Sequence, residues 1–379
     1  MSMPHSSMDE PGLERPSDAE VEVSLIGPGY GECVVIHLGG NRWMVVDSCL
    51  DKESGRPAAL IHLEKMGVNP AEHVDLVVCT HWHDDHVRGL AALLSQCPSA
   101  RFICSTSLRE SAFLRLVALG ENVRGLHGSG LSEFARIFQR IKTRREQNKP
   151  APLETCHAGS VLLDREEMGQ TIRVDALSPS EGDHQRMAEI FKDHHDHLLA
   201  ADFRIAVPSI HPNLGSIVLR VQAGRRRVLL GADMERRPSS DSGWLAILES
   251  SKEENRSDYY KVAHHGSENG DTPEIWSRLL VPECPAVLAP NQRLANPLPR
   301  KTDISRILSR TSVAYSTALP SLRAKRIEAP AEGVFRSKGI RIHEVPRCQG
   351  TVIARANMNG SEPWGITTLG RAYRLVEAV

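Results

Sequence analysis

The sequence predicts an α/β fold built around a mixed sheet, and three observations lead to this class. The chain has 379 residues, of which 40% are hydrophobic, so it is able to bury a sizeable core. Apolar segments of strand length alternate with segments of helical periodicity through the N-terminal third. Two of the first strands are joined by a short turn, and such a hairpin places antiparallel pairs in the sheet.

The elements of the N-terminal third follow in a regular order. The first strand alternates apolar Val21, Val23 and Leu25 with polar residues, which is typical of a half-buried strand. A short helix follows the hairpin, with Leu60 and Leu63 on its inner face. The full order is strand VEVSLIG, hairpin strands CVVIHL and RWMVVD, helix PAALIHLEKMG, strand DLVVCT, helix GLAALLSQ and strand ARFICS.

Residues 107–150 are predicted to be mostly helical, because Leu131, Phe134 and Phe138 mark one face of a helix. Strands and helices alternate again after them, and the chain becomes less apolar from residue 301 onward. The later elements are strand TIRVDALSPS, polar helix DHQRMAEIFKDHHDHLLAADF, the strand pair GSIVLRVQAGRRRVLLGAD, strand YYKVAHHGS, strand PAVLAP and the terminal hairpin TVIARANMNGSEPWGITTL.

The net charge and the positions of the cysteines limit the kinds of partner and the cellular compartment that the sequence is compatible with. The net charge is −1, with 46 basic and 47 acidic residues, so a nucleic acid would have to be bound through a local patch. The eight cysteines form no CxxC pair, and several lie in apolar runs, which is typical of reduced thiols in a cytosolic protein. The N-terminal residues lack the apolar core of a signal peptide, and no segment has the length of a membrane span. We therefore expect a cytoplasmic protein without a membrane partner, with a flexible tail over residues 1–19.

The segment CTHWHDDHVRG, residues 79–89, concentrates histidine and aspartate directly after an apolar strand. A polar surface loop is the ordinary explanation, and a metal site is the alternative. His81 and His83 are two positions apart, so both side chains project to one side of an extended segment. Asp85 and His86 follow where a helix starts, so the two pairs are able to face two neighbouring ions. Imidazole and carboxylate are ligands for zinc and other first-row divalent ions, and this pattern at a strand end favours a metal site.

Two ions need more ligands than this loop carries, and the second half of the chain supplies candidates. Asp233 ends one strand, where a carboxylate can bridge two ions, and His264 and His265 end another. His211 lies in the loop before a third strand. Active sites of α/β enzymes form where strands give way to loops. A structural role beside Pro212 is the alternative for His211, and one histidine of the adjacent pair is also a candidate for supporting ligands or contacting substrate.

Two further clusters are weaker candidates. The histidines of DHHDH, residues 193–197, lie in a polar helix without strand context, so a solvated surface is favoured over the edge of a site. Arg136, Arg140 and Arg144 recur on one helix face. This row indicates a solvated face, with phosphate contact as the alternative.

The ordered set of motifs resembles the metallo-β-lactamase fold superfamily. The segment HWHDDH, residues 81–86, is similar to the family's His-x-His-x-Asp-His signature. Asp47 resembles its first motif, a structural carboxylate, and Asp233 resembles its bridging aspartate. The pair at 264–265 resembles its final histidine motif. Within the superfamily, IGPGYGECVVI, NLGSIVLRV and KVAHHGS are most similar to the soluble domain of ComEC-type DNA-uptake proteins and their stand-alone relatives.

The resemblance covers residues 21–290 and implies a four-layer αββα sandwich of two mixed sheets, with the metals at one edge. We therefore expect a catalytic domain over residues 20–300 with a helical insertion at 107–200, and a C-terminal extension over 301–379 that packs on it. His211 and Asn213 each fit the family's third-motif histidine imperfectly.

The resemblance also implies a dinuclear metallo-hydrolase that holds two divalent ions, zinc first and manganese or iron as alternatives. A hydroxide on the metals is the expected nucleophile. Asp85 would orient the water, and Asp47 would support the ligand loop. His265, His264 or Lys261 would assist the leaving group or contact a phosphate. The expected ligands are His81, His83, Asp85, His86, His211, Asp233, His264 and His265.

The substrate class is constrained less than the reaction type. The ComEC-type resemblance implies hydrolysis of phosphodiester bonds in nucleic acid or in a smaller nucleotide. Only 4% of the residues are aromatic, so stacking platforms for a long nucleic acid are scarce. An ester, lactone or thioester hydrolase on the same metal pair is the first alternative, and a non-catalytic, metal-stabilised scaffold is the second. The insertion and the C-terminal region are candidate surfaces for a protein partner or a second copy.

Overall fold

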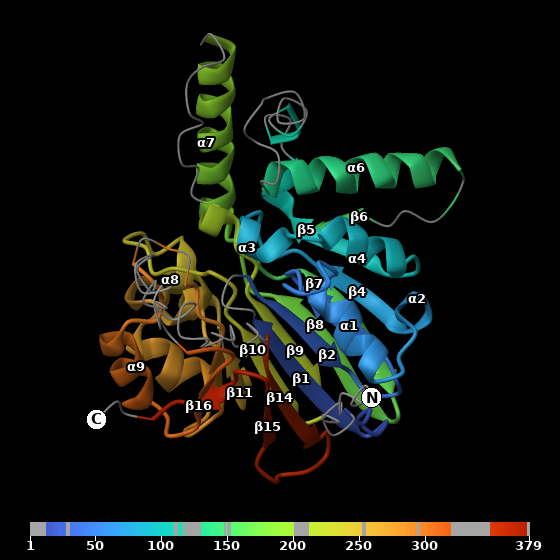
Figure 1. Cartoon of the computed structure of the whole chain (residues 1–379). Helices are drawn as coiled ribbons and strands as arrows, with labels where there is room; N and C mark the ends of the chain where they lie inside the picture. The colour runs from blue at the N-terminus through green and yellow to red at the C-terminus, as the bar shows by residue number, and fades with distance from the viewer. Residues whose placement is uncertain are drawn as a thin grey trace, which may run out of the picture.

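The computed structural model contains two eight-stranded sheets that pack face to face, with helices on both outer sides (Figure 1). The apolar strand segments pair side by side because each buries a face against the other sheet. The structure describes residues 13–27, 31–109, 113–115, 117, 130–147, 149, 153–200, 212–251, 255–292, 294, 296–319 and 349–376, without the side chains of 193–200 and 212.

The first sheet has an antiparallel half and a parallel half. The pairs from β15 to β3 are antiparallel, and the pairs from β3 to β6 are parallel. The hairpin predicted near the N-terminus is the pair β2–β3. The order across the sheet is β15 (Gly365–Leu369), β14 (Gly350–Asn357), β1 (Glu20–Gly27), β2 (Cys33–His37), β3 (Trp43–Val46), β4 (Val74–Val78), β5 (Arg101–Ser105) and β6 (Leu153–Cys156).

The second sheet repeats this division. The pairs from β13 to β10 are parallel, and the pairs from β10 to β7 are antiparallel. Consequently β10, β11 and β12 end at one common edge. The order is β16 (Tyr373–Arg374), β13 (Ala314–Ser316), β12 (Ala286–Leu288), β11 (Tyr259–Lys261), β10 (Arg226–Leu230), β9 (Leu219–Ala223), β8 (Gln170–Ala176) and β7 (Val161–Glu167).

Three apolar clusters separate the layers. One lies between the two sheets, one between the first sheet and its helices, and one between the second sheet and its helices. These clusters define four layers and confirm the predicted α/β sandwich of two mixed sheets. The helices are α1 (Ala58–Lys65), α2 (Pro70–His73), α3 (Asp84–Val87), α4 (Leu90–Gln96), α6 (Gly130–Glu146), α7 (Glu181–Ala200), α8 (Gly243–Ser250) and α9 (Lys301–Leu308), with 3₁₀ turns η1 (Thr106–Arg109), η2 (Pro212–Gly215), η4 (His264–Gly266) and η5 (Glu268–Gly270) and a π turn η6 (Ile275–Leu279).

Two segments differ from the sequence-based boundaries. The region 107–200 contains α6 and α7 but also β6, β7 and β8, which belong to the main sheets. β7 lies at the edge of its sheet and carries several charged residues, so the alternation of apolar and polar residues that predicts a strand is hard to recognise in it. The region 301–379 supplies β13 and β16 to the second sheet and β14 and β15 to the first. β14 pairs with β1 along its whole length, so this region forms part of the sandwich itself.

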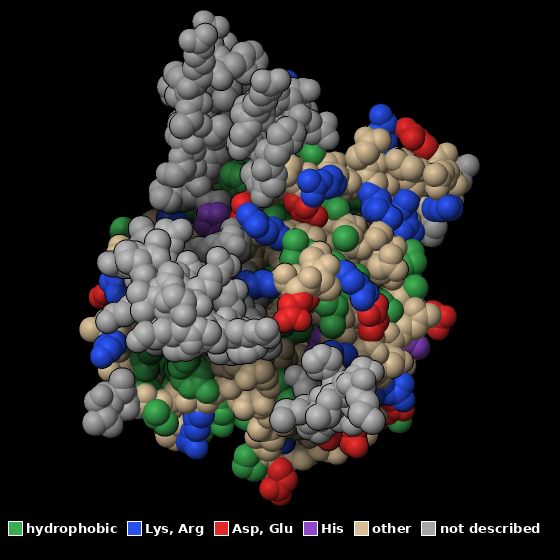
Figure 2. All heavy atoms as spheres, viewed as in Figure 1, with side chains coloured by type: hydrophobic (Ala, Val, Ile, Leu, Met, Phe, Trp, Pro, Cys, Tyr) green, Lys and Arg blue, Asp and Glu red, His purple; other side chains and the backbone are tan. Residues whose placement is uncertain are grey.

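Two further predictions concern the arginine row on α6 and segments that could span a membrane. Lys and Arg side chains gather along α6 in Figure 2. In the arginine row, Arg136 pairs with Glu133 at 2.9 Å and Arg144 donates to Pro98 O at 2.8 Å. No helix among the described residues is long and apolar enough to cross a membrane.

Candidate metal centre

The loop after β4 carries the first candidate ligands into the edge where the parallel strands end. β4 is buried along most of its length, and His81 follows it with 1% of its surface exposed. The short helix α3 then turns the chain, so that Asp85 and His86 are buried while His83 is partly exposed. Two neighbouring segments hold the loop in place: Glu32 N donates to Asp85 O at 2.9 Å, and Ser48 N donates to His86 O at 2.7 Å.

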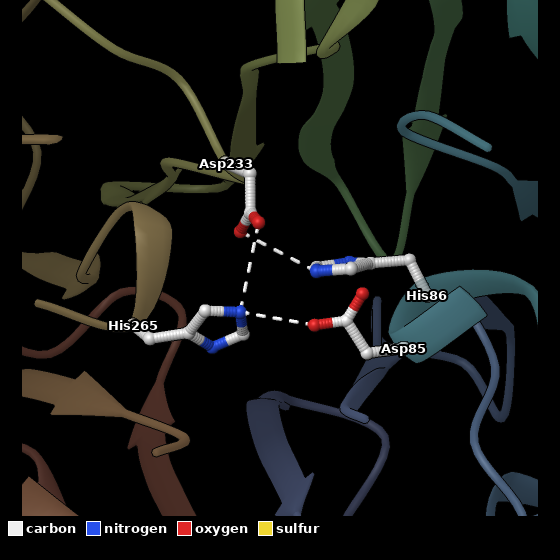
Figure 3. Close-up of side chains that lie close together, drawn as sticks. All are labelled: Asp85, His86, Asp233 and His265. Carbon is white, nitrogen blue, oxygen red and sulfur yellow. Dashed lines mark hydrogen bonds and ion pairs between the residues drawn. The ribbon is translucent and has the colours of Figure 1, made fainter. Parts of the chain in front are cut away.

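Four side chains from three loops converge at this edge: Asp85, His86, Asp233 and His265 (Figure 3). Each offers one nitrogen or oxygen, and these four atoms lie within 4.8 Å of one another. His86 Nε2 is 3.3 Å from Asp233 Oδ1, and His265 Nε2 is 3.2 Å from Asp85 Oδ2 and 3.6 Å from Asp233 Oδ2. We call this group the Asp85–His265 cluster.

A second group shares Asp233 with the first. His81, His83 and Asp233 each offer one atom within the same 4.8 Å limit. His81 Nε2 lies 3.3 Å from His83 Nδ1 and 3.8 Å from Asp233 Oδ2. We call this group the His81–His83 cluster. Asp233 therefore stands between two sets of potential ligands.

Asp233 reaches this position through a close passage of two strand ends. β10 ends at Leu230, and a Cβ on Gly231 would lie 2.9 Å from Ala263 N. Glycine thus lets the Asp233 loop pass the loop that carries His265. His264 N also donates to Ala232 O at 2.9 Å, which ties the two loops together.

Asp47 anchors the ligand loop from the end of β3. Its Oδ1 accepts from Thr80 N, and its Oδ2 accepts from the Thr80 hydroxyl, both at 2.7 Å. Its Oδ2 also lies 2.7 Å from His86 Nδ1. A carboxylate at Nδ1 fixes the ring so that Nε2 points at Asp233, as outer partners of ligand histidines commonly do.

The charges of the two clusters suit a cation. Burial is the main reason that the pKa values of His81 and His83 lie below their usual range, so both rings are neutral and have a free lone pair. Against the effect of burial, Asp233 and its neighbouring carboxylates raise the pKa of His265 to about 9 and that of His86 well above its usual range. The protons on His265 and His86 balance the negative charge of the buried carboxylates when no cation is bound.

Unsatisfied polar atoms provide a further test of whether a cation fits. His86 Nε2 and Asp233 Oδ1 are buried and lie 3.3 Å apart, but neither makes a hydrogen bond of regular geometry among the described residues. Leaving buried polar atoms without good hydrogen bonds costs free energy, and buried charges are normally paired or bound to a metal. Imidazole nitrogens and carboxylate oxygens are also the ligands that first-row divalent ions prefer. The residues present therefore fit a divalent metal.

Lys261 and Glu32 form a buried ion pair behind the Asp85–His265 cluster. Lys261 is 2% exposed, contacts Glu32 and donates to Ala232 O at 3.2 Å. Glu32 lies 3.9 Å from Nδ1 of His86 and 3.8 Å from Nδ1 of His265. The pair is thus on the side of both rings that faces away from Asp233. Glu32 also forms a third group of potential ligands with Asp47 and His86.

The structure separates the roles of His264 and His265. Both have left-handed backbone angles, with φ of 46° and 54° respectively, and such strain is common at functional sites. His265 turns into the cluster, whereas His264 Nδ1 lies 3.4 Å from Glu235 Oε1 and its Nε2 lies 3.4 Å from Asn213 Nδ2. Glu235 also accepts from Asn213 and Asn269, at 3.1 and 3.0 Å.

Some predicted residues cannot be placed, and one contributor was not predicted. His211 lies outside the described residues, as do the side chains of the histidines in 193–197. Asn291, in the segment after β12, donates from Nδ2 to Asp85 Oδ2 at 2.8 Å. The signal that could have found it is its place after the apolar run PAVLAP, where a third parallel strand ends at the same edge.

Comparison with known proteins agrees with this geometry. Residues 26–139 match the family model described as the metallo-beta-lactamase superfamily. This part of the chain, less than half of its length, is therefore similar to that superfamily. This superfamily consists of hydrolytic metalloenzymes that usually bind divalent metals. No curated protein matches the chain.

The solved structures with some similarity to the chain include the following three proteins. The B3 metallo-beta-lactamase MEM-A1 from a soil metagenome library shares 13% identity over 64% of this chain and 78% of its own, with a TM-score of 0.34. The metallo-beta-lactamase fold protein YhfI from Bacillus subtilis shares 13% identity over 64% of this chain and 70% of its own, with a TM-score of 0.31. The hydrolase AbOPH shares 12% identity over 58% and 72%, with a TM-score of 0.33.

Proposed function

We propose that the protein is a metal-dependent hydrolase that binds two divalent ions, with zinc as the favoured metal, and that it cleaves phosphodiester bonds. The observation that carries the proposal is the position of Asp233, which is shared by the Asp85–His265 cluster and the His81–His83 cluster. A carboxylate between two groups of ligands is suited to bridge two ions. Two divalent ions at such a site supply an acidified water and neutralise charge that develops on substrate oxygens.

The protein's own residues have distinct parts in this proposal. Asp85, His86 and His265 would hold one ion, and His81 and His83 the other. Asp47 keeps His86 in the orientation that presents Nε2, since its carboxylate lies at Nδ1. Lys261 is too deeply buried to contact a substrate, so we assign it to balancing the charge of Glu32.

The phosphodiester preference is supported by the surroundings of His264. The side chains beside it are amides and a carboxylate, Asn213, Glu235 and Asn269, and Arg237 pairs with Glu235 at 2.8 Å. Polar groups of this kind suit a nucleotide or another phosphodiester, where donors contact phosphate and sugar oxygens. The motifs that resemble those of ComEC-type proteins favour the same substrate class.

An ester or lactone hydrolase has weaker support. It would need an apolar pocket beside the metals. Trp82 lies between the two histidines of the ligand loop, but its ring packs on Phe113 at 5.8 Å and Phe191 at 6.3 Å. Both phenylalanines are fully buried in the helical layer of the first sheet, so these aromatic rings form part of the core.

The experiment compares two neighbouring aspartates of the same motif. Asp85 belongs to the cluster, whereas Asp84 is partly exposed and pairs with Arg88 at 3.3 Å. We expect purified protein to bind two equivalents of zinc and to hydrolyse bis-p-nitrophenyl phosphate. Asp85→Asn should abolish turnover, and the matched control Asp84→Asn should retain it. Cleavage of p-nitrophenyl acetate but not of the phosphodiester would favour the acyl hydrolase, and absence of metal binding would refute the proposal.

A further inference from the structure

The segment that follows β12 contacts two members of the Asp85–His265 cluster. Ala289 O lies 2.9 Å from His265 Nδ1, and Asn291 Nδ2 donates to Asp85 Oδ2 at 2.8 Å. β12 runs parallel to β11, and β11 leads into the turn η4 that contains His265, so the two strands end at the same edge. One short segment therefore reaches both the acidic and the imidazole side of this cluster.

The amide of Asn291 is held rigidly. Its backbone N donates to Leu298 O, and its O accepts from Leu298 N, both at 3.0 Å. Asn291 is 4% exposed, and its partner Asp85 is 7% exposed. A hydrogen bond between two buried groups on constrained backbone holds its geometry better than a contact at the surface, where water competes.

The contact distinguishes the two oxygens of Asp85. Oδ2 accepts from Asn291 and lies 3.2 Å from His265 Nε2. The other oxygen points toward the side of His86 in Figure 3. When a cation takes the Nε2 lone pair of His265, that nitrogen no longer donates to Asp85. Asn291 then remains as the donor that keeps Oδ2 in place.

We infer that Asn291 is a positioning residue that fixes the orientation of the Asp85 carboxylate toward a bound cation. Together with Ala289 O, it supports Asp85 and His265 in the way that Asp47 supports His86. An amide suits this position because it donates without adding charge, whereas a carboxylate would repel Asp85 and an aliphatic side chain would leave Oδ2 without its donor. The inference rests on the metal site of the proposed function.

The test is zinc binding by the metal-free full-length protein, measured by competition with a chromophoric chelator. Asn291→Leu keeps the size of the side chain and removes the donor. We expect one of the two zinc equivalents to bind roughly 10–100-fold more weakly, as is usual when a partner of a ligand is lost, and the other to be unchanged. Gln292→Ala is the matched control, because Gln292 is the next residue and is exposed. It should bind both equivalents like the wild type.

A second variant and a second readout separate positioning from folding. Asn291→Ser introduces no bulk and also withdraws the donor, so it should reproduce the effect if Asn291→Leu does not fold. In the cobalt-loaded protein, the d–d absorption of one ion should shift in both variants, while thermal unfolding of the metal-free protein stays close to wild type. Unchanged zinc affinity and spectra in the serine variant would overturn the inference. A wild-type protein that binds no zinc would overturn both this inference and the proposed function.

Discussion

Replacement of Asp47 by asparagine tests how the ligand loop is oriented. Asp47 has φ of 62°, in the left-handed region, which asparagine tolerates better than alanine does. The substitution therefore preserves the backbone and the size of the side chain. It exchanges one carboxylate oxygen for an amide nitrogen among the acceptors of Thr80 N, the Thr80 hydroxyl and His86 Nδ1.

The expected loss of metal affinity depends on which of these three hydrogen bonds can form again with an amide. The Thr80 hydroxyl can rotate to accept, and Oδ1 can keep accepting from Thr80 N. His86 Nδ1 would then face an amide donor, so the neutral ring would favour the tautomer with its proton on Nε2. That proton would occupy the atom that faces Asp233. Loss of a charge-assisted hydrogen bond costs about 1.5–3 kcal/mol, which corresponds to roughly a 10–100-fold loss in affinity for the ion that His86 binds.

Zinc affinity by chelator competition and the tautomer of His86 by ¹⁵N NMR would measure the two steps separately. Asp51→Asn is a matched control, because Asp51 is partly exposed and its side chain accepts hydrogen bonds from Ser54, in its own turn and away from the two clusters. We expect Asp47→Asn to weaken one zinc equivalent and, in the metal-free protein, to leave His86 with a proton on Nε2 but none on Nδ1, whereas the raised pKa of His86 keeps both nitrogens protonated in the wild type. Unchanged affinity for both equivalents, or an unchanged tautomer together with weakened binding, would refute the reasoning.

Three further predictions follow from other contacts. Burial lowers the pKa of His37 from 6.5 to about 4. Between these two pH values the imidazole is protonated in the unfolded chain but not in the folded protein, so the free energy of unfolding falls as the pH decreases. The free energy of unfolding, measured with a chemical denaturant, should therefore fall by about 3 kcal/mol more in wild type than in His37→Gln between pH 6.5 and pH 4. The same pH dependence in both proteins would contradict this prediction. Arg226→Ala should destabilise the protein by about 3–5 kcal/mol in the same assay, because it leaves Asp258 and the carbonyls of Asn357 and Glu362 without their buried guanidinium; a change below that of an exposed arginine such as Arg140→Ala would count against it. His83→Ala should weaken only the looser zinc equivalent in a stepwise titration, and loss of the tighter one would show that the two clusters are assigned in reverse.

The parts of the site that sequence could predict are those with distinctive chemistry at strand ends. His81, His83, Asp85 and His86 follow an apolar strand within six positions, and Asp233 ends another. The choice between His264 and His265 could not be made, because both follow the same strand and both have left-handed backbone angles, which the sequence pattern does not predict.

Other features depend on pairing between residues that are far apart in the sequence, for which the local signal is weak. Asn291 is an ordinary amide in sequence, and its partner Asp85 lies 206 positions away. β14 continues the first sheet only because its alternating residues match β1 in an antiparallel register, from Glu20 with Asn357 to Gly27 with Gly350. A strand of this kind reads locally as half of a terminal hairpin, since its pairing with β15 is close in sequence and its pairing with β1 is not.

The contacts of the ring nitrogens explain why the two clusters should bind metal with different strength. Nδ1 of His81 lies 3.0 Å from the Thr80 hydroxyl, that of His86 lies 2.7 Å from Asp47, and that of His265 lies 2.9 Å from Ala289 O. Three unrelated partners thus leave Nε2 of each ring directed at Asp233.

His83 is different, because its Nδ1 faces His81 Nε2 and its side chain is partly exposed. Among the described residues, the His81–His83 cluster has one fixed imidazole, one less constrained imidazole and the shared carboxylate of Asp233. The Asp85–His265 cluster has two fixed imidazoles and a second carboxylate held by Asn291. Since preorganised ligands lose less conformational freedom on binding, the Asp85–His265 cluster should take up the first ion, and the ion at His83 should be the one that exchanges.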